Sequence, residues 1–236
     1  MNKDNVIIAC DFASGEEVYS FLDLFGEEHP FVKVGMELFY AEGPNIVREL
    51  KHRGHKIFLD LKLHDIPNTV KKAMAVLRRM DVDMCNLHAS GTREMMAAAL
   101  EGLTREDGSR PILLAVTQLT STSEVRMHDD LLIDGHIADV VVHYARCAHQ
   151  TGLDGVVCSP LEAAMVKQAC GSSFVIVTPG IRFADGVVGD QVRITTPDRA
   201  RKMGADYIVV GRPITSAANP VEAYHRCLEE FNANTN

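Results

Sequence analysis

The stretch Ile57-Phe-Leu-Asp-Leu-Lys-Leu-His-Asp-Ile-Pro-Asn-Thr69 begins with apolar, strand-forming residues that two charges interrupt. Residues 57–61 predict a buried strand, and residues two apart on a strand share a face, so we expect Asp60 and Lys62 to point the same way. Burying one charge alone is costly, whereas burying a pair costs much less. Asp65 follows the expected end of the strand, just before a proline that begins a helix. The stretch therefore predicts an acid–base–acid set, D-x-K-x-x-D, at the carboxyl end of a strand.

Each of these residues also has a purely structural explanation. Asp60 and Lys62 could form a structural ion pair, and Asp65 could cap the following helix by accepting backbone N–H bonds. Structural ion pairs perturb charges without taking part in chemistry, so the triplet by itself favours the structural explanation. The rest of the chain changes that balance.

Length and composition narrow the class of protein. The chain has 236 residues, 46% of them hydrophobic and 24% charged, which is typical of a globular protein with one large domain or two small ones. No apolar run is long enough to span a bilayer and no signal peptide is evident, so we expect a cytoplasmic protein without a membrane partner. The net charge of −8 argues against a nucleic-acid partner. The six cysteines form no C-x-x-C pair, so neither a disulfide framework nor a zinc site is indicated.

Strand patterns and helix patterns alternate along the whole chain. This alternation predicts a (β/α)8 TIM barrel that forms a single domain over residues 1–236, with residues 232–236 frayed. A doubly wound open sheet is the main rival, but no G-x-G-x-x-G follows the first strand. The predicted strands are Val6–Cys10, Phe31–Val34, Ile57–Leu61, Met84–Leu87, Ile112–Val116, Gly155–Cys158, Phe174–Val177 and Tyr207–Val210. The predicted helices begin after Ser14 and then cover Asn45–Arg53, Pro67–Met80, Thr92–Leu103, Asp139–Gln150, Leu161–Ala169, Pro197–Met203 and Pro220–Phe231.

Polar residues gather where the predicted strands end, and in such a barrel the active site lies at that end. Two lysines and three aspartates there are hard to explain structurally, because charges placed together mainly lower stability. A hydrogen bond to a neighbour explains His88 at least as well as catalysis does. No set of His, Asp and Glu has metal-ligand spacing, so we expect no metal. The strand-end residues are Asp11, Lys33, Asp60, Lys62, Asp65, Asn86, His88, Thr120, Arg182 and Arg212.

A phosphate site is predicted beside the last two strands. The connection Pro179–Thr195 is long and glycine-containing, as lids and binding loops are, although a disordered insertion would have the same pattern. Phosphate sites in these barrels are commonly built from the loops after strands 7 and 8. Gly211 would let a backbone N–H approach phosphate, and Arg212 would bind it bidentately. Arg182 and Gln191 lie on the lid side of this site.

These motifs together resemble the orotidine 5′-phosphate decarboxylase family. The resemblance spans residues 6 to 230 and is specific in combination. Thr92 is a mild departure, since many members have a second glycine there. The matching segments are Asp60-Leu-Lys-Leu-His-Asp-Ile-Pro-Asn-Thr69, Asp11, Lys33, Val116-Thr-Gln-Leu-Thr120, Thr178-Pro-Gly-Ile-Arg182, Gln191 and Val210-Gly-Arg-Pro213.

The resemblance implies decarboxylation of orotidine 5′-phosphate to uridine 5′-phosphate in a homodimer, without metal or organic cofactor. Lys62 would protonate C6, with Asp60 and Lys33 beside it and Asp65 completing the charged set from the neighbouring subunit. The implied substrate contacts are Asp11 and Lys33 with the ribose, Thr120 with the pyrimidine, Ile66 and Thr69 across the dimer interface, and Pro179, Arg182, Gln191, Gly211 and Arg212 with the phosphate.

Two other functions compete with this one. Mg²⁺-dependent 3-keto-L-gulonate 6-phosphate decarboxylases and their hexulose-phosphate synthase relatives also carry D-x-K-x-x-D. They place a carboxylate on strand 2, where this chain has Lys33, a cation that would repel the metal. A non-catalytic phosphate-binding barrel would need Arg212 but not the charged triplet. Turnover of orotidine 5′-phosphate with and without EDTA separates the three.

Overall fold

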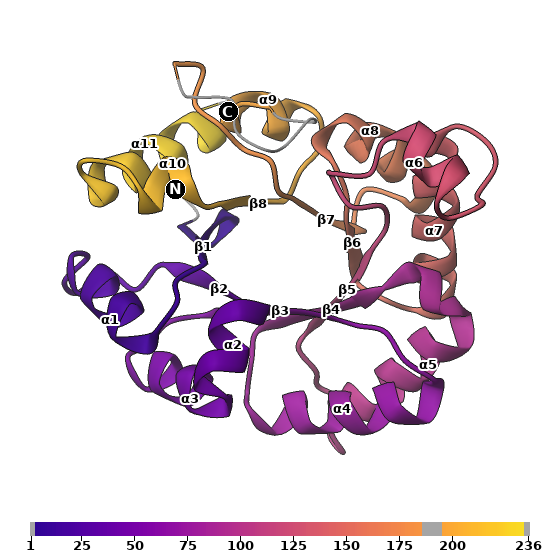
Figure 1. Ribbon diagram of the computed structural model, residues 1–236, viewed down its shortest axis with the longest axis horizontal. Helices are drawn as coiled ribbons and strands as arrows, with labels where there is room; N and C mark the ends of the chain where they lie inside the picture. The colour runs from indigo at the N-terminus through magenta and orange to yellow at the C-terminus, as the bar shows by residue number, and fades with distance from the viewer. Residues whose placement is uncertain (1–2, 186–194, 234–236) are drawn as a thin grey trace.

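Eight parallel strands close into a barrel, as the alternating pattern predicted (Figure 1). The computed structural model describes residues 3–185 and 195–233. Each strand pairs with the next in sequence, and β1 pairs with β8 to close the ring. The strands are β1 (Val6–Cys10), β2 (Phe31–Gly35), β3 (Ile57–Leu63), β4 (Met84–His88), β5 (Ile112–Val116), β6 (Gly155–Val157), β7 (Val175–Thr178) and β8 (Tyr207–Val210).

Helices surround the barrel (Figure 1). They are α1 (Gly15–Asp23), α2 (Met36–Glu42), α3 (Pro44–His52), α4 (Pro67–Arg79), α5 (Thr92–Leu103), α6 (Glu124–Asp129), α7 (Ile137–Thr151), α8 (Pro160–Cys170), α9 (Pro197–Lys202), α10 (Arg212–Thr215) and α11 (Pro220–Asn232). Two short 3-10 turns are η1 (Lys3–Asn5) and η2 (Ala89–Gly91).

The predicted strands are confirmed, and their ends differ from the predicted ends by at most two residues. Local signals place the helix ends: Ser14 Oγ accepts the N–H of Glu17 at the start of α1, and Gly152 ends α7 with φ of +95°. The prediction missed α2, α6 and α10, which have seven, six and four residues. Helices this short show less than two turns of apolar periodicity.

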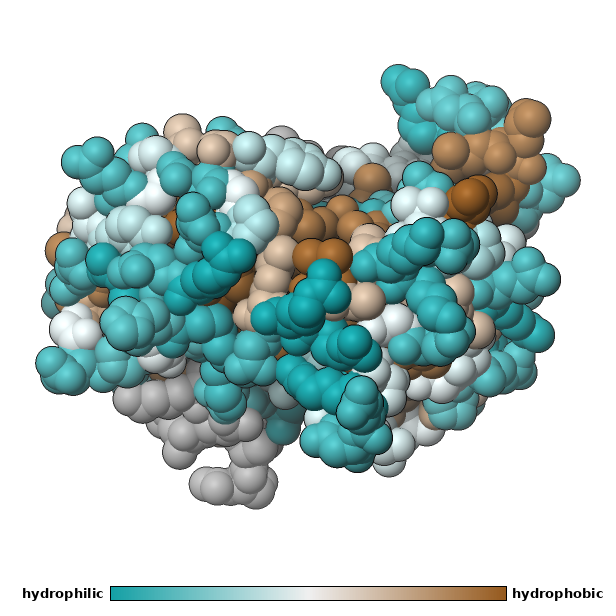
Figure 2. Space-filling model, turned by 90° about the horizontal axis from the view of Figure 1, so that it is seen from below, coloured by the Kyte–Doolittle hydropathy of each residue, from teal (hydrophilic) through white to brown (hydrophobic). Residues whose placement is uncertain are grey.

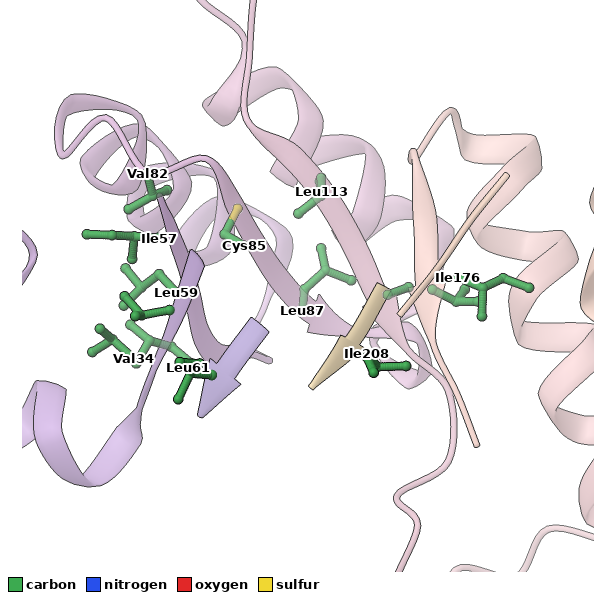
Figure 3. Close-up of a cluster of buried hydrophobic side chains, with 14 of the residues drawn as sticks. Val34, Ile57, Leu59, Leu61, Val82, Cys85, Leu87, Leu113, Ile176 and Ile208 are labelled. Atoms are coloured by element: carbon green, nitrogen blue, oxygen red, sulfur yellow. The ribbon is translucent and has the colours of Figure 1, made fainter. Parts of the chain in front are cut away.

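Two apolar cores hold the barrel. The larger core lies between strands and helices, where one face of each strand packs outward, as Val34, Leu59 and Leu87 do (Figure 3). The smaller core fills the barrel interior with Ile7, Ala9, Phe31, Phe58, Met84, Leu114, Val177 and Val209. Because side chains alternate, the inward face of each strand continues past this core toward its carboxyl end. That end of the interior is where the polar residues lie.

The side of the molecule that carries α3 and α4 is mainly hydrophilic, with apolar residues showing in limited areas (Figure 2). Among residues 3–185 and 195–233, no helix has both the length and the hydrophobicity that a membrane crossing requires. The stretch predicted to fray, 232–236, begins inside α11, where the Asn232 side chain donates to the carbonyl of Leu228 at 2.8 Å. Residues 234–236 lie outside the described residues.

Candidate active site

A cavity of about 500 Å³ opens at the carboxyl ends of the strands. Apolar side chains of the inner core, such as Phe58 and Val209, form part of its wall, and charged side chains from several strands form the rest. The lining residues are Ala9, Asp11, Lys33, Phe58, Asp60, Lys62, Val116, Gln118, Leu119, Thr120, Ser121, Val157, Cys158, Pro179, Gly180, Arg182, Val209, Gly211 and Arg212. Most of the predicted site residues therefore meet in one place.

Four side chains of alternating charge form a continuous chain along the cavity. Lys33 Nζ lies 2.9 Å from Asp11 Oδ1 and 3.4 Å from Asp60 Oδ2. Lys62 Nζ donates to the other oxygen, Asp60 Oδ1, at 2.7 Å. These residues come from the ends of three neighbouring strands, and we name them the charged chain (Asp11–Lys33–Asp60–Lys62).

The middle of the charged chain is deeply buried and still ionised. The side chains of Lys33 and Asp60 are 10% and 12% exposed. Burial favours the neutral form of Lys33, but Asp60 and Asp11 outweigh it and raise its pKa. Burial likewise acts to raise the pKa of Asp60, but Lys33 and Lys62, with hydrogen bonds from Lys62 and Asn86, lower it. Two fixed opposite charges thus face the cavity in a region of low dielectric constant.

Lys62 reaches Asp60 through an irregular backbone. The sequence predicted that regular strand alternation would place Asp60 and Lys62 on the same face. The two side chains do pair, but the backbone between them is not a regular strand, so the predicted reason is wrong. The register of β3 against β4 shifts between Leu59 and Leu63, and Lys62 has φ of +51°. A left-handed backbone costs a residue with a Cβ roughly 1–2 kcal/mol. Such strain is typical of functional sites, and here it sets the direction of a lysine.

Gly35, at the end of β2, makes room for the charged chain. A Cβ at this position would lie 3.0 Å from Lys33 Nζ and 3.2 Å from Asp11 Oδ1. Any larger residue would push against the Lys33–Asp11 pair. The absence of a side chain at position 35 therefore leaves room for the pair. The backbone of Gly35 itself, with φ of −90°, is one that other residues also adopt.

Four of the predicted phosphate residues line the opposite side of the cavity from β3. Pro179 and Arg182 follow β7, and Gly211 and Arg212 lie after β8, at the start of α10. A Cβ at Gly211 would make an ordinary contact of 3.6 Å with Ala9, so crowding does not require the glycine.

The base of the long β7–α9 connection is closed. Arg182 donates its backbone N–H to the carbonyl of Thr195 at 3.0 Å, and Thr195 donates to the carbonyl of Gly180 at 3.1 Å. An isolated parallel bridge joins Ile181 to Thr195. The two ends of the connection are thereby held together beside the cavity. Gln191 lies outside the described residues.

Three predicted residues do not reach the cavity of their own chain. Asp65, Ile66 and Thr69 are exposed at the start of α4, and Ile66 is 67% exposed. The alternative role of Asp65 as a helix cap does not fit either. The N-cap residue of α4 is Ile66, which makes no side-chain cap bond, and Asp65 Oδ1 accepts the adjoining N–H of Ile66 at 2.6 Å rather than an N–H of the first turn of the helix.

Sequence reasoning undervalued two buried polar residues. Gln118, 8% exposed, lines the cavity just beyond β5. Asn86 on β4, 1% exposed, donates to Asp60 Oδ1 at 2.7 Å and accepts the backbone N–H of Lys62 at 2.8 Å. Both residues stand in motifs that the sequence analysis placed at strand ends. An amide side chain next to a predicted buried strand was the signal that could have marked them as site residues. His88 does not line the cavity; burial, then His64 and Lys62, lower its pKa.

Metal-ligating side chains do not cluster in the part of the chain that the structure describes: no group of three or more His, Cys, Asp or Glu is arranged to hold an ion. All six cysteines are free thiols, five of them buried.

Comparison with known proteins points the same way. Residues 4–227 match the Orotidine 5'-phosphate decarboxylase / HUMPS family. Orotidine 5'-phosphate decarboxylase from Geobacillus sp. (strain WCH70) is 55% identical over 232 residues, which is 97% of each chain. The enzyme of the same name from Bacillus cytotoxicus is 56% identical over 230 residues, covering 96% of this chain and 97% of the relative.

Solved structures agree in fold. The crystal structure of orotidine 5'-phosphate decarboxylase from Lactobacillus acidophilus has a TM-score of 0.87 at 41% identity, covering 97% of this chain and 99% of that one. An uncharacterized conserved protein from Geobacillus kaustophilus has a TM-score of 0.86 at 50% identity, covering 96% of this chain and all of that one. With its barrel, its charged chain and these relatives, the chain belongs to the Orotidine 5'-phosphate decarboxylase / HUMPS family.

Proposed function

We propose that the protein decarboxylates orotidine 5′-phosphate to uridine 5′-phosphate and CO2, the last step of de novo UMP synthesis. The charged chain carries the proposal, because it presents an ammonium group, Lys62, beside a carboxylate in a nucleotide-sized cavity. The names of the close relatives support the same reaction.

The reaction needs a fixed positive charge. When the bond between C6 and the carboxylate breaks, its electron pair stays on C6, in the plane of the ring, where no adjacent π-system accepts it. Without a cofactor as electron sink, the site must stabilise this carbanion by charge. The Lys62 ammonium does so and then transfers a proton to C6, and solvent reprotonates the lysine.

Asp60 has two roles in this step. Its Oδ1 holds Lys62 Nζ at 2.7 Å, which fixes the proton donor. Its negative charge also faces the substrate carboxylate, and it repels that group more than it repels the neutral CO2 that forms. Lys33 keeps Asp60 ionised from the other side and, with Asp11, binds the ribose.

Remote binding supplies further catalytic free energy. We assign the phosphate to Pro179, Arg182, Gln191, Gly211 and Arg212, and the pyrimidine to Thr120. The phosphate lies far from C6, so its binding accelerates the reaction by driving closure over the site. The cavity wall formed by the β7 and β8 loops supports this assignment.

The Mg²⁺-dependent sugar-phosphate decarboxylase is not favoured. Both oxygens of Asp60 already face lysine nitrogens, at 2.7 Å and 3.4 Å, and a cation at this carboxylate would be repelled. The test measures release of uridine 5′-phosphate from orotidine 5′-phosphate with and without EDTA. We expect turnover that EDTA does not change. Absence of turnover refutes the decarboxylase, and loss of turnover in EDTA refutes the metal-free mechanism.

We also propose that the active site is shared in a homodimer. Asp65, Ile66 and Thr69 stand clear of the cavity in their own chain, with Ile66 67% exposed, and a two-fold interface would deliver all three to the partner's site. Asp65 would then extend the charged chain next to Lys62.

The test of sharing mixes two inactive variants, Asp65→Ala and Lys62→Ala. In a mixed dimer one site carries both changes and the other carries neither. With free exchange of equal amounts, we expect about one quarter of wild-type activity to return. If activity stays absent after mass spectrometry shows that subunits have exchanged, Asp65 acts within its own chain.

A further inference from the structure

β3 departs from a regular strand at the residue to which we assign the proton transfer. Between two paired positions, Leu59 with Cys85 and Leu63 with Leu87, β3 advances four residues while β4 advances two. Lys62 lies inside this bulge with φ of +51°. A strand that bulges loses its regular ladder bonds, so the N–H of Lys62 needs another acceptor.

Asn86 supplies that acceptor from the neighbouring strand. Its Oδ1 accepts the backbone N–H of Lys62 at 2.8 Å, and its Nδ2 donates to Asp60 Oδ1 at 2.7 Å. The same Asp60 oxygen accepts Lys62 Nζ at 2.7 Å. One amide therefore holds both the backbone of the lysine and the carboxylate that orients its ammonium group.

The chemistry of the amide is matched to this position. It is 1% exposed, so unsatisfied polar atoms would be costly there. A carboxylate could accept from Lys62 but would repel Asp60, and an aliphatic side chain would serve neither partner. Asn86 is itself fixed by β4, which pairs with β5 through Asn86 and Leu114.

We infer that Asn86 is a positioning residue for the decarboxylation, holding Lys62 in its strained conformation and aligning Asp60 with it. This inference rests on the proposed function. Asn86 does not line the cavity and need not touch substrate. Its effect is therefore expected in kcat and in the ionisation of Asp60, with little change in nucleotide binding.

The charged and titratable surroundings of Asp60 decide how the variants behave. Lys33 faces it from β2, Lys62 from β3, and Asp11 lies behind Lys33 after β1. His88 on β4 is close enough to interact electrostatically with Asp60. In Asn86→Ala these groups remain and one hydrogen-bond donor disappears. In Asn86→Asp the donor is replaced by a second negative charge.

The experiment measures kcat against pH and the dissociation constant of uridine 5′-phosphate for wild type, Asn86→Ala and Asn86→Asp. We expect both variants to lower kcat about 100-fold, as a small misplacement of a reacting group does. The acid limb of kcat should move to higher pH, further in Asn86→Asp than in Asn86→Ala. Binding of uridine 5′-phosphate should stay within about threefold, as expected for a residue outside the cavity.

Thr117→Val is the matched control. Thr117, 4% exposed, directly follows β5, and its hydroxyl donates to the carbonyl of Val157 at 3.0 Å, so the change also removes a part-buried side-chain hydrogen bond at this end of the barrel. We expect its kcat and acid limb to equal those of wild type.

Several results would overturn the inference. A kcat within threefold of wild type in both Asn86 variants, an acid limb that does not move, or an equal loss in Thr117→Val each means that Asn86 is only structural. Loss of uridine 5′-phosphate binding in parallel with kcat means the same. If wild type itself does not turn over orotidine 5′-phosphate, the proposed function fails instead.

Discussion

The two ends of the barrel both carry pairs of acidic and basic residues, but they use them differently. At the amino end, three aspartates directly precede strands β4, β6 and β8, and each accepts a backbone N–H from the neighbouring strand and pairs with one cation. We name them the amino-end pairs: Lys51–Asp83, with the N–H of Ile57 at 2.8 Å; Arg110–Asp154, with the N–H of Leu113 at 2.7 Å; and Lys167–Asp206, with the N–H of Ile176 at 2.8 Å.

Burial and backbone geometry separate the two ends. The aspartates of the amino-end pairs are 31–34% exposed, whereas Asp60 in the charged chain is 12% exposed. No residue of the amino-end pairs has a positive φ, whereas Lys62 does. The amino-end pairs tie neighbouring strands together and stabilise the barrel. The charged chain concentrates opposite charges around a buried centre, Lys33 and Asp60, and includes the strained Lys62, while Asp11 at its outer end is 60% exposed. A buried centre with backbone strain is expected where charge acts on a substrate.

The largest expected effect is that of Lys62→Ala. Loss of both the cation and the proton donor should lower kcat at least about 1,000-fold. The fold should persist, because Asp60 keeps Lys33 and Asn86 as partners. Steady-state kinetics and circular dichroism check the two halves of this prediction. Near-normal turnover in the variant would remove Lys62 from the mechanism.

Arg212→Ala should act through phosphate. We expect kcat/KM for orotidine 5′-phosphate to fall about 100-fold, because a charge-assisted bidentate contact is lost. Orotidine, which lacks the phosphate, should be a poor substrate for both proteins and equally poor with each. Equal fractional losses on the two substrates would contradict a phosphate role.

Asp154→Ala tests the amino end of the comparison. The change leaves Arg110 without its carboxylate and Leu113 N–H without its acceptor, so the free energy of unfolding should fall by about 1–3 kcal/mol. Values of kcat and KM should stay at wild-type level, since the pair lies at the other end of the barrel. Urea unfolding curves and kinetics on the same preparation check this. If the folded variant lost activity, the claim that the amino-end pairs serve stability alone would be wrong.

The smallest effect concerns pH. The pKa of Asp60 is lower in the folded protein than in the unfolded chain, so its stabilising contribution is present above the unfolded value, near 4, and is lost as pH falls through the folded value. The difference in unfolding free energy between wild type and Asp60→Asn should thus be constant above about pH 5 and shrink in stronger acid. A difference that grows in acid would mean that the charged chain raises the pKa of Asp60.

Local sequence determined the barrel and most of its site. Short apolar β-type runs that alternate with helical patterns predicted the eight strands, and the rule that barrel sites lie at the carboxyl ends of strands predicted that Asp11, Lys33, Asp60 and Lys62 lie together. Helices too short to show a period, such as α6 and α10, left no such signal.

Tertiary structure alone decided how the charges meet. The bulge that turns Lys62 arises from the pairing of β3 with β4, and its N–H finds Asn86, 24 residues away in sequence. A side chain at position 35 would crowd Lys33 Nζ and Asp11 Oδ1, a constraint that comes from these two neighbours and not from the backbone angles of Gly35. Sequence patterns record which face a residue occupies, since that depends on near neighbours. Distances between side chains on different strands depend on how the whole sheet twists and closes, and only the folded barrel fixes them.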